Sequence, residues 1–285
     1  MSAFFSPSQS NCYFMTLLQA LILGLVQGLT EFLPVSSSGH LVLIQKVMGV
    51  EDQGITFEIF VHFATLLSVV IYFWKVLWKM VLAILPPFKP EYARERKMIG
   101  LLALATVPAV VVGLGFKDSF EQAYESPVMV SLLLLVTGTI LFLPRVLARF
   151  KKDPSEVKVK SALAMGIGQA FAILPGVSRS GSTIVAGMLS GAKSEDAAEF
   201  SFLMAIPAIA GAMVLALKDI AAEGIDTGLL THYIAGGVVA FLSGLVAIYS
   251  VLAAVRRGRF EWFAYYCFLA GIGFFLWFRY GVGSA

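Results

Sequence analysis

Chemistry-bearing side chains are few in two long apolar segments of this chain. Glu31 and His40 are the only ionisable residues between positions 15 and 45, and Arg179 is the only one between 161 and 192. All three lie within or beside a serine-rich run that contains or follows a proline. Carboxylate, imidazole, guanidinium and hydroxyl groups together favour acid–base chemistry on a phosphorylated substrate.

The spacing of Gln27 and Glu31 adds a candidate cation site. The two residues are four positions apart, so they share one face of a helix. Their side-chain oxygens suit a hard divalent cation, although a structural polar pair at a helix interface is the alternative. His40 is a candidate acid–base group, and a hydrogen bond to a backbone carbonyl is the simpler role for it.

The serine runs indicate helix N-termini that can bind an anion. Ser36, Ser37 and Ser38 precede an apolar stretch, where an N-cap belongs. A helix N-terminus offers free N–H groups to an anion. The run around Arg179 repeats this pattern and adds a guanidinium, which can hold two phosphate oxygens at once. We therefore predict a phosphate site, against the alternatives of plain helix caps and a snorkelling arginine.

The overall composition places these side chains in a membrane protein. Of 285 residues, 58% are hydrophobic and 14% are charged, whereas soluble domains carry about 25% charged residues. A spanning helix needs about 20 apolar residues. Six segments meet that requirement: 60–80, 97–116, 127–147, 197–217, 233–255 and 261–280.

The two chemistry-bearing segments, 15–48 and 161–192, do not read as plain spans. Each is apolar but interrupted by its proline and serine run, and each half is too short to cross a bilayer alone. We predict two re-entrant hairpins, each a helix, a loop and a helix. Broken backbone of this kind is tolerated in a membrane only inside the protein or beside a wet cavity.

The two hairpins resemble each other at an offset of 142 positions. Six residues of the first match six of the second: Gly24, Gln27, Val35, Ser36, Ser38 and Gly39 with Gly166, Gln169, Val177, Ser178, Ser180 and Gly181. The same offset brings the first three spans close to the last three. We predict an all-α polytopic membrane protein with two repeats, 1–150 and 151–285, each a hairpin plus three spans. Chance similarity between helix breaks is the alternative.

An odd number of spans per repeat makes the second copy inverted, with the site near the midplane. Basic connections at 75–97, 145–160 and 256–259 are predicted to be cytoplasmic, and the acidic loops 117–126 and 218–230 external, with both termini outside. Because the basic residues are spread over short loops, no nucleic-acid partner is expected. Cys12 and Cys267 are expected to be packing residues.

Two runs of residues carry a family resemblance. Residues 27–40, QGLTEFLPVSSSGH, and residues 175–183, PGVSRSGST, resemble the two signatures of the bacterial undecaprenyl-diphosphate phosphatases, the bacitracin-resistance family. The resemblance implies hydrolysis of a polyprenyl diphosphate lipid to its monophosphate, which recycles the lipid carrier for cell-wall synthesis. It also implies the bacterial inner membrane, a site open to the periplasm, and a divalent cation, Mg²⁺ or Ca²⁺.

The resemblance also implies roles for individual residues. Catalytic positions are Glu31, His40, Ser37 and Arg179; phosphate-binding positions are Ser36, Ser38, Ser178, Ser180 and Thr183; metal ligands are Glu31 and Gln27. Three positions depart from the family pattern. Gln27 is the less charged choice, Ser38 stands where Thr is common, and His62 stands where Gln is common. His62 is expected to lie at the membrane interface.

Other functions stay open at this point. Inverted repeats with re-entrant hairpins are also transporter architecture, so a transporter or flippase of a phosphorylated lipid is the main alternative. An ion channel is weaker, because no continuous polar stripe runs through the spans. Acid-phosphatase-like lipid phosphatases need a His soon after Ser-Arg, and here none follows Arg179 before His232. The nucleophile is either Ser37 or a water, and a homodimer is compatible with the sequence.

Overall fold

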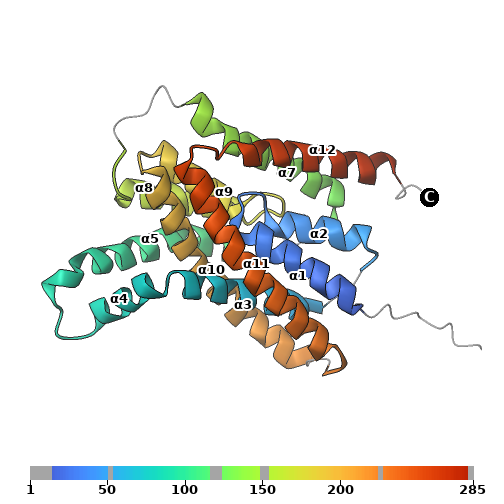
Figure 1. Ribbon diagram of the computed structural model, residues 1–285, viewed down its shortest axis with the longest axis horizontal. Helices are drawn as coiled ribbons and strands as arrows, with labels where there is room; N and C mark the ends of the chain where they lie inside the picture. Colours follow the sequence, from blue (N-terminus) through green and yellow to red (C-terminus); the bar gives the residue numbers. More distant parts are fainter. Residues whose placement is uncertain (1–14, 51–53, 116–123, 148–153, 224–226, 282–285) are drawn as a thin grey trace, which may run out of the picture.

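The computed structural model describes residues 15–50, 54–115, 124–147, 154–223 and 227–281. The two predicted hairpins are confirmed as helix, break and helix. The first consists of α1 (Leu17–Phe32) and α2 (Ser37–Val47), and the second of α8 (Val159–Phe171) and α9 (Arg179–Leu189). In Figure 1 the first hairpin runs in from the right and the second from the left, and their turns meet near the centre.

Long apolar helices surround the hairpins. They are α5 (Ala93–Gly115), α7 (Pro127–Val146), α10 (Ser194–Glu223), α11 (Leu230–Arg256) and α12 (Trp262–Tyr280). Within the described ranges, these five are long and apolar enough to cross a membrane. Short 3-10 helices, η1 (Pro90–Tyr92) and η3 (Thr227–Leu229), precede α5 and α11. The predicted spans at 97–116, 127–147, 197–217, 233–255 and 261–280 are confirmed as single helices.

The predicted span at 60–80 is wrong as one continuous helix. The chain forms α3 (Gly54–Tyr72) and α4 (Trp74–Ile84), and the two are bent by 80° at Phe73. The first turns of α4 alternate tryptophans with Lys75 and Lys79, and Trp74 and Trp78 are exposed. Aromatic and basic side chains of this kind suit a helix at the membrane interface. The sequence stays apolar across the bend at Phe73, so hydropathy alone predicts one helix there.

The hairpins are held by helices from the opposite half of the sequence. The helix α1 packs along α11, and α8 packs along α5. A side chain at Gly24 would meet the backbone of Gly236, and one at Gly166 would meet the backbone of Ala105. Glycines permit this close approach of helix backbones. The helices α3 and α10 also pack together, as do α7 and α12. These pairings suit two related halves, but the division at residue 150 stays a prediction.

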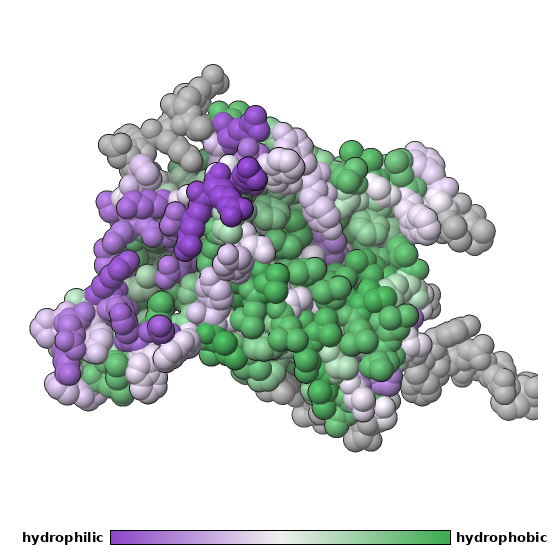
Figure 2. All heavy atoms as spheres, viewed as in Figure 1, coloured by the Kyte–Doolittle hydropathy of each residue, from purple (hydrophilic) through white to green (hydrophobic). Residues whose placement is uncertain are grey.

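The outside of the bundle is broadly apolar. Figure 2 shows a hydrophobic surface over the lower right part of α11, with hydrophilic residues gathered around the upper end of α11 and along the left side of the molecule. Bulky apolar side chains such as Leu242, Val246 and Leu269 are more than half exposed. A surface of this kind is expected where lipid replaces water. Cys267 is buried as predicted, while Cys12, residues 117–123 of the first acidic loop and residues 224–226 of the second lie outside the described residues.

Candidate active site

Two helix N-termini meet where the hairpins turn. Ser36 caps α2 by accepting a hydrogen bond from the Gly39 backbone N–H at 3.3 Å, and Ser178 caps α9 in the same way from Gly181 at 3.0 Å. A side chain on Gly39 would collide with the Gly176 backbone, so the two turns lie in direct contact. The predicted N-caps are therefore confirmed, and the N-termini of α2 and α9 lie next to each other.

A buried ion pair joins the two hairpins. The Arg179 Nη2 atom donates to Glu31 Oε1 at 2.8 Å, and its Nη1 atom donates to the Ser201 carbonyl at 3.2 Å. The exposed fractions of the two charged side chains are only 16% and 7%. Charges removed from water are rarely retained without a partner or a function. This arrangement rules out a snorkelling role for Arg179.

The other carboxylate oxygen of Glu31, Oε2, accepts hydrogen bonds from Ser37 and Gln27. The Ser37 hydroxyl donates to Glu31 Oε2 at 2.6 Å, and the Gln27 amide donates to the same oxygen at 3.0 Å. A short bond from a hydroxyl to a carboxylate is a strong, charge-assisted one. Glu31 is therefore placed to accept a proton from Ser37 while Arg179 holds its second oxygen.

His40 is directed elsewhere. Its Nδ1 atom lies 2.8 Å from the Ser36 carbonyl oxygen, and its Nε2 atom lies 2.9 Å from the Tyr266 hydroxyl. Both ring nitrogens thus face groups other than Ser37. His40 thus makes the hydrogen bond to a backbone carbonyl that was the simpler role expected for it, and Glu31 is the hydrogen-bond partner of Ser37.

The hydroxyls predicted to bind phosphate lie around the two hairpin turns, and several already make hydrogen bonds within the protein. Ser180 donates to the Leu33 carbonyl at 3.1 Å, which ties the second hairpin to the first. Thr183 is fully buried and bonds to the Arg179 carbonyl at 2.8 Å and to Ser201 at 2.6 Å. Ser36 and Ser38 lie 3.4 Å apart, and Ser178 and Ser180 3.3 Å apart. Their phosphate-binding role stays a prediction.

Sequence reasoning missed three aromatic residues beside the site. His62, expected at the interface, places its Nε2 atom 3.9 Å from Glu31 Oε2. Tyr266 contacts His40 through its hydroxyl, and Tyr124 lies near Ser38. Although 40% of Tyr124 is exposed, desolvation of its hydroxyl raises its pKa to about 12, with a further contribution from Glu58. Their distance along the chain from the hairpins concealed all three.

The predicted ligands for a cation are Gln27 and Glu31. The Gln27 Oε1 atom is buried and has no hydrogen-bond partner within the described structure. Across the described ranges no group of three or more His, Cys, Asp or Glu side chains is placed to hold a metal ion. Gln27 and Glu31 therefore fit a cation that takes most of its oxygens from a phosphorylated ligand.

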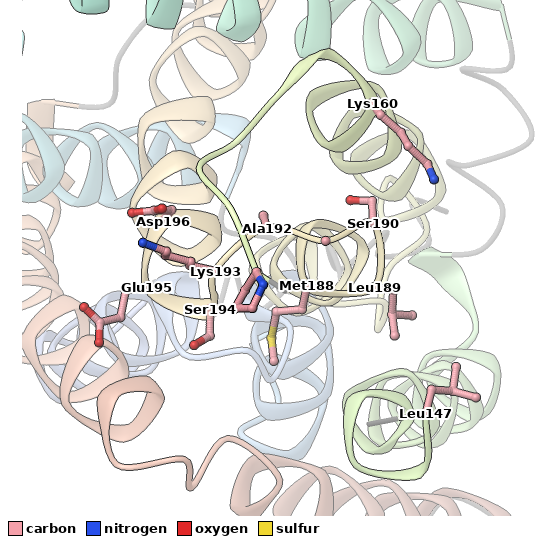
Figure 3. A pocket seen from close by; sticks show the side chains of 12 residues that line it. Leu147, Lys160, Met188, Leu189, Ser190, Ala192, Lys193, Ser194, Glu195 and Asp196 are labelled. Atoms are coloured by element: carbon pink, nitrogen blue, oxygen red, sulfur yellow. The ribbon is translucent and has the colours of Figure 1, made fainter. Parts of the chain in front are cut away.

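A cavity of about 970 Å³ lies away from this site, between the end of α9 and the start of α10. Figure 3 shows its lining, where Lys193 and Asp196 project from one wall and Ser190 and Lys160 lie on another. None of the residues predicted for the active site lines it. The predicted site is thus set by the hairpin turns and is separate from this cavity.

The fold and the site together define a multi-pass membrane protein that joins a serine, a carboxylate and an arginine from two hairpins. Residues 20–273 match the family model described as bacitracin resistance protein BacA. The chain belongs to this family, as its two signature runs indicated.

Curated relatives extend over nearly the whole chain. A protein of Rhodopirellula baltica named undecaprenyl-diphosphatase is 41% identical over 257 residues, which cover 90% of this chain and 96% of the relative. Proteins with the same name are 40% identical in Halothermothrix orenii, over 90% of this chain and 96% of the relative. In Syntrophotalea carbinolica the identity is 43%, over 92% of this chain and 98% of the relative.

Proposed function

We propose that this protein hydrolyses undecaprenyl diphosphate to undecaprenyl phosphate and inorganic phosphate. The observation that carries the proposal is the Ser37–Glu31–Arg179 arrangement, in which one carboxylate contacts both a hydroxyl nucleophile and a guanidinium. The names of the relatives support the same reaction. An apolar bundle around a phosphate site also suits a substrate whose long tail stays in lipid.

In the proposed first step, Ser37 attacks the terminal phosphorus. Glu31 takes the hydroxyl proton through Oε2 as the new bond between the serine oxygen and phosphorus forms. The bond between the terminal phosphorus and the bridging oxygen breaks, and undecaprenyl phosphate leaves with the proton that Glu31 passes to that oxygen. A water then attacks the phosphoserine and gives its proton to Glu31, which returns it to the Ser37 oxygen as the bond between that oxygen and phosphorus breaks. Inorganic phosphate is released and Ser37 is restored.

Arg179 and the two helix N-termini stabilise the charge of the transferred phosphoryl group. Arginine carries five N–H donors, and within the described part of the chain Arg179 donates to two groups, Glu31 and Ser201. The remaining donors can reach phosphate oxygens, over which charge spreads during the transfer. Free backbone N–H groups at the starts of α2 and α9 also stabilise the negative charge of the phosphoryl group.

A divalent cation belongs to the proposal as well. Gln27 and Glu31 would hold Mg²⁺ or Ca²⁺ together with oxygens of the diphosphate. When bound, the ion neutralises part of the negative charge of the substrate. The unpartnered Gln27 Oε1 atom supports this placement.

The proposed setting is the bacterial inner membrane, with the site open to the periplasm. The loop charges support that orientation. A homodimer stays a prediction of the sequence. Phosphate release from a soluble short-chain polyprenyl diphosphate by purified protein tests the activity. A pure transporter or flippase releases none, so the absence of phosphate under all cation conditions would overturn the proposal.

A further inference from the structure

His40 connects the first hairpin to the last helix of the chain. Its ring stacks on Tyr266 of α12, with centroids 5.6 Å apart and planes inclined by 13°. Phe274, two turns further along α12, packs edge-on against the same ring at 6.5 Å. His40 is only 2% exposed. The imidazole is therefore enclosed by α12 on one side and by its own hairpin on the other.

The hydrogen bonds determine which ring nitrogen carries the proton. The Ser36 carbonyl oxygen can only accept, so Nδ1 of His40 donates to it. In the neutral ring Nε2 then holds the lone pair, and the Tyr266 hydroxyl donates to it. A continuous chain of donors thus runs from Tyr266 through His40 to the Ser36 carbonyl.

Ser36 is the residue on which this chain ends, and its backbone is strained. It has a φ of +72°, and it is the one non-glycine residue with positive φ in the described structure. Such a conformation persists only where surrounding contacts enforce it. The next residue is Ser37, whose hydroxyl points to Glu31. The backbone conformation of Ser36 therefore sets the direction in which the Ser37 side chain points.

We propose that Tyr266 is a positioning residue of the active site. Through His40 it holds the carbonyl of Ser36 and keeps the strained turn that presents Ser37 to Glu31. His40 acts in this arrangement as the link between Tyr266 and the turn. The inference rests on the proposed function, since Ser37 is the reacting group there.

Tyr266→Phe tests the proposal because it removes the hydroxyl and keeps the stacked ring. Tyr265→Phe is the matched control, since Tyr265 is the adjacent tyrosine of α12 and packs on Phe142. Loss of one positioning hydrogen bond should lower kcat by about threefold to tenfold, with KM little changed. The Tyr265 variant should keep both constants. A kcat of Tyr266→Phe equal to that of the control would overturn the proposal.

The ring nitrogens of His40 supply a readout that does not depend on activity. The chain has three histidines, so ¹⁵N-histidine spectra can be assigned by comparison with His40→Ala. The Nε2 signal of His40 should move toward that of a free acceptor in Tyr266→Phe and stay in place in Tyr265→Phe. An unmoved signal would refute the contact. If wild-type protein released no phosphate, the proposed function would fail while this spectrum still decided the contact.

Discussion

Arg179 Nη2 lies 2.8 Å from Glu31 Oε1, although 148 positions separate the two residues along the chain. Each comes from the turn region of a different hairpin, and each is the principal charge of its hairpin. The pair joins the two halves of the site and leaves the second carboxylate oxygen to Ser37. Three predictions address this site, one addresses helix packing and one addresses orientation in the membrane.

Arg179→Lys should keep the charge and lose most of the turnover. An ammonium acts as a point charge and cannot span Glu31, the Ser201 carbonyl and two phosphate oxygens. We expect roughly a hundredfold loss of kcat, as for removal of one donor to a developing oxyanion, and a larger loss for Arg179→Ala. Phosphate release at matched expression measures both. A lysine variant with near wild-type turnover would mean that Arg179 only anchors the hairpin.

Glu31→Gln should remove the proton acceptor while preserving the size of the side chain. A general acid–base group accounts for roughly a hundred- to ten-thousandfold in rate, so most activity should be lost. Gln27→Ala should cost less, because Gln27 contacts the carboxylate without accepting the serine proton. Thermal unfolding of both variants checks that Arg179, left without its carboxylate, does not simply unfold the protein. Near-normal turnover by Glu31→Gln would exclude it from the mechanism.

Ser37→Ala should abolish turnover if Ser37 is the nucleophile. Ser36→Ala removes a helix cap, which typically stabilises a protein by about 1 kcal/mol. This variant should therefore lose more stability than turnover. Ser38→Ala serves as the second neighbour control. Acid quenching of the wild-type reaction with labelled substrate should trap phosphoserine at position 37. Equal and modest losses at positions 36, 37 and 38 without trapped phosphoserine would instead indicate attack by water.

Gly166→Ala and Gly24→Ala should destabilise the bundle. Each added methyl group meets helix backbone, of Ala105 and Gly236 respectively, which cannot move aside as a side chain can. Overpacking of this kind costs about 1–3 kcal/mol. Gly100→Ala is the control, because nothing lies within 4 Å of its added carbon. Unfolding temperatures in detergent compare the three, and equal temperatures would contradict the close helix contacts.

Cysteine labelling tests the orientation in the membrane. In a chain with Cys12 and Cys267 replaced by alanine, Glu125→Cys should react with an impermeant reagent added to intact cells. Lys89→Cys should react only after the cells are opened, because basic loops stay in the cytoplasm. Labelling of position 89 from outside would contradict both the loop-charge argument and the inverted arrangement.

Several features of the molecule follow from local chemistry and were predictable. Ser36 and Ser178 cap helices because a hydroxyl after a helix break satisfies free N–H groups wherever the chain then goes. The hairpins follow from apolar halves too short to span. Glu31 and Arg179 were identifiable because charges in apolar segments are rare and functional.

The bend at Phe73 could not be predicted in the same way. Hydropathy continues from α3 into α4, so the composition of 60–80 alone suggested one helix. The direction of α4 depends on where its tryptophans and lysines meet the membrane interface, which is a property of the assembled bundle.

The sequence by itself determined the class of protein, the two hairpins and the main charged residues, because hydropathy, helix capping and the rarity of intramembrane charge are local properties. Only the tertiary structure decided which side chains of the site contact each other. It paired Ser37 with Glu31, turned His40 toward Tyr266 of α12, and brought His62 beside the carboxylate. These contacts join residues on different helices, and their geometry depends on how the helices pack, which no local pattern encodes.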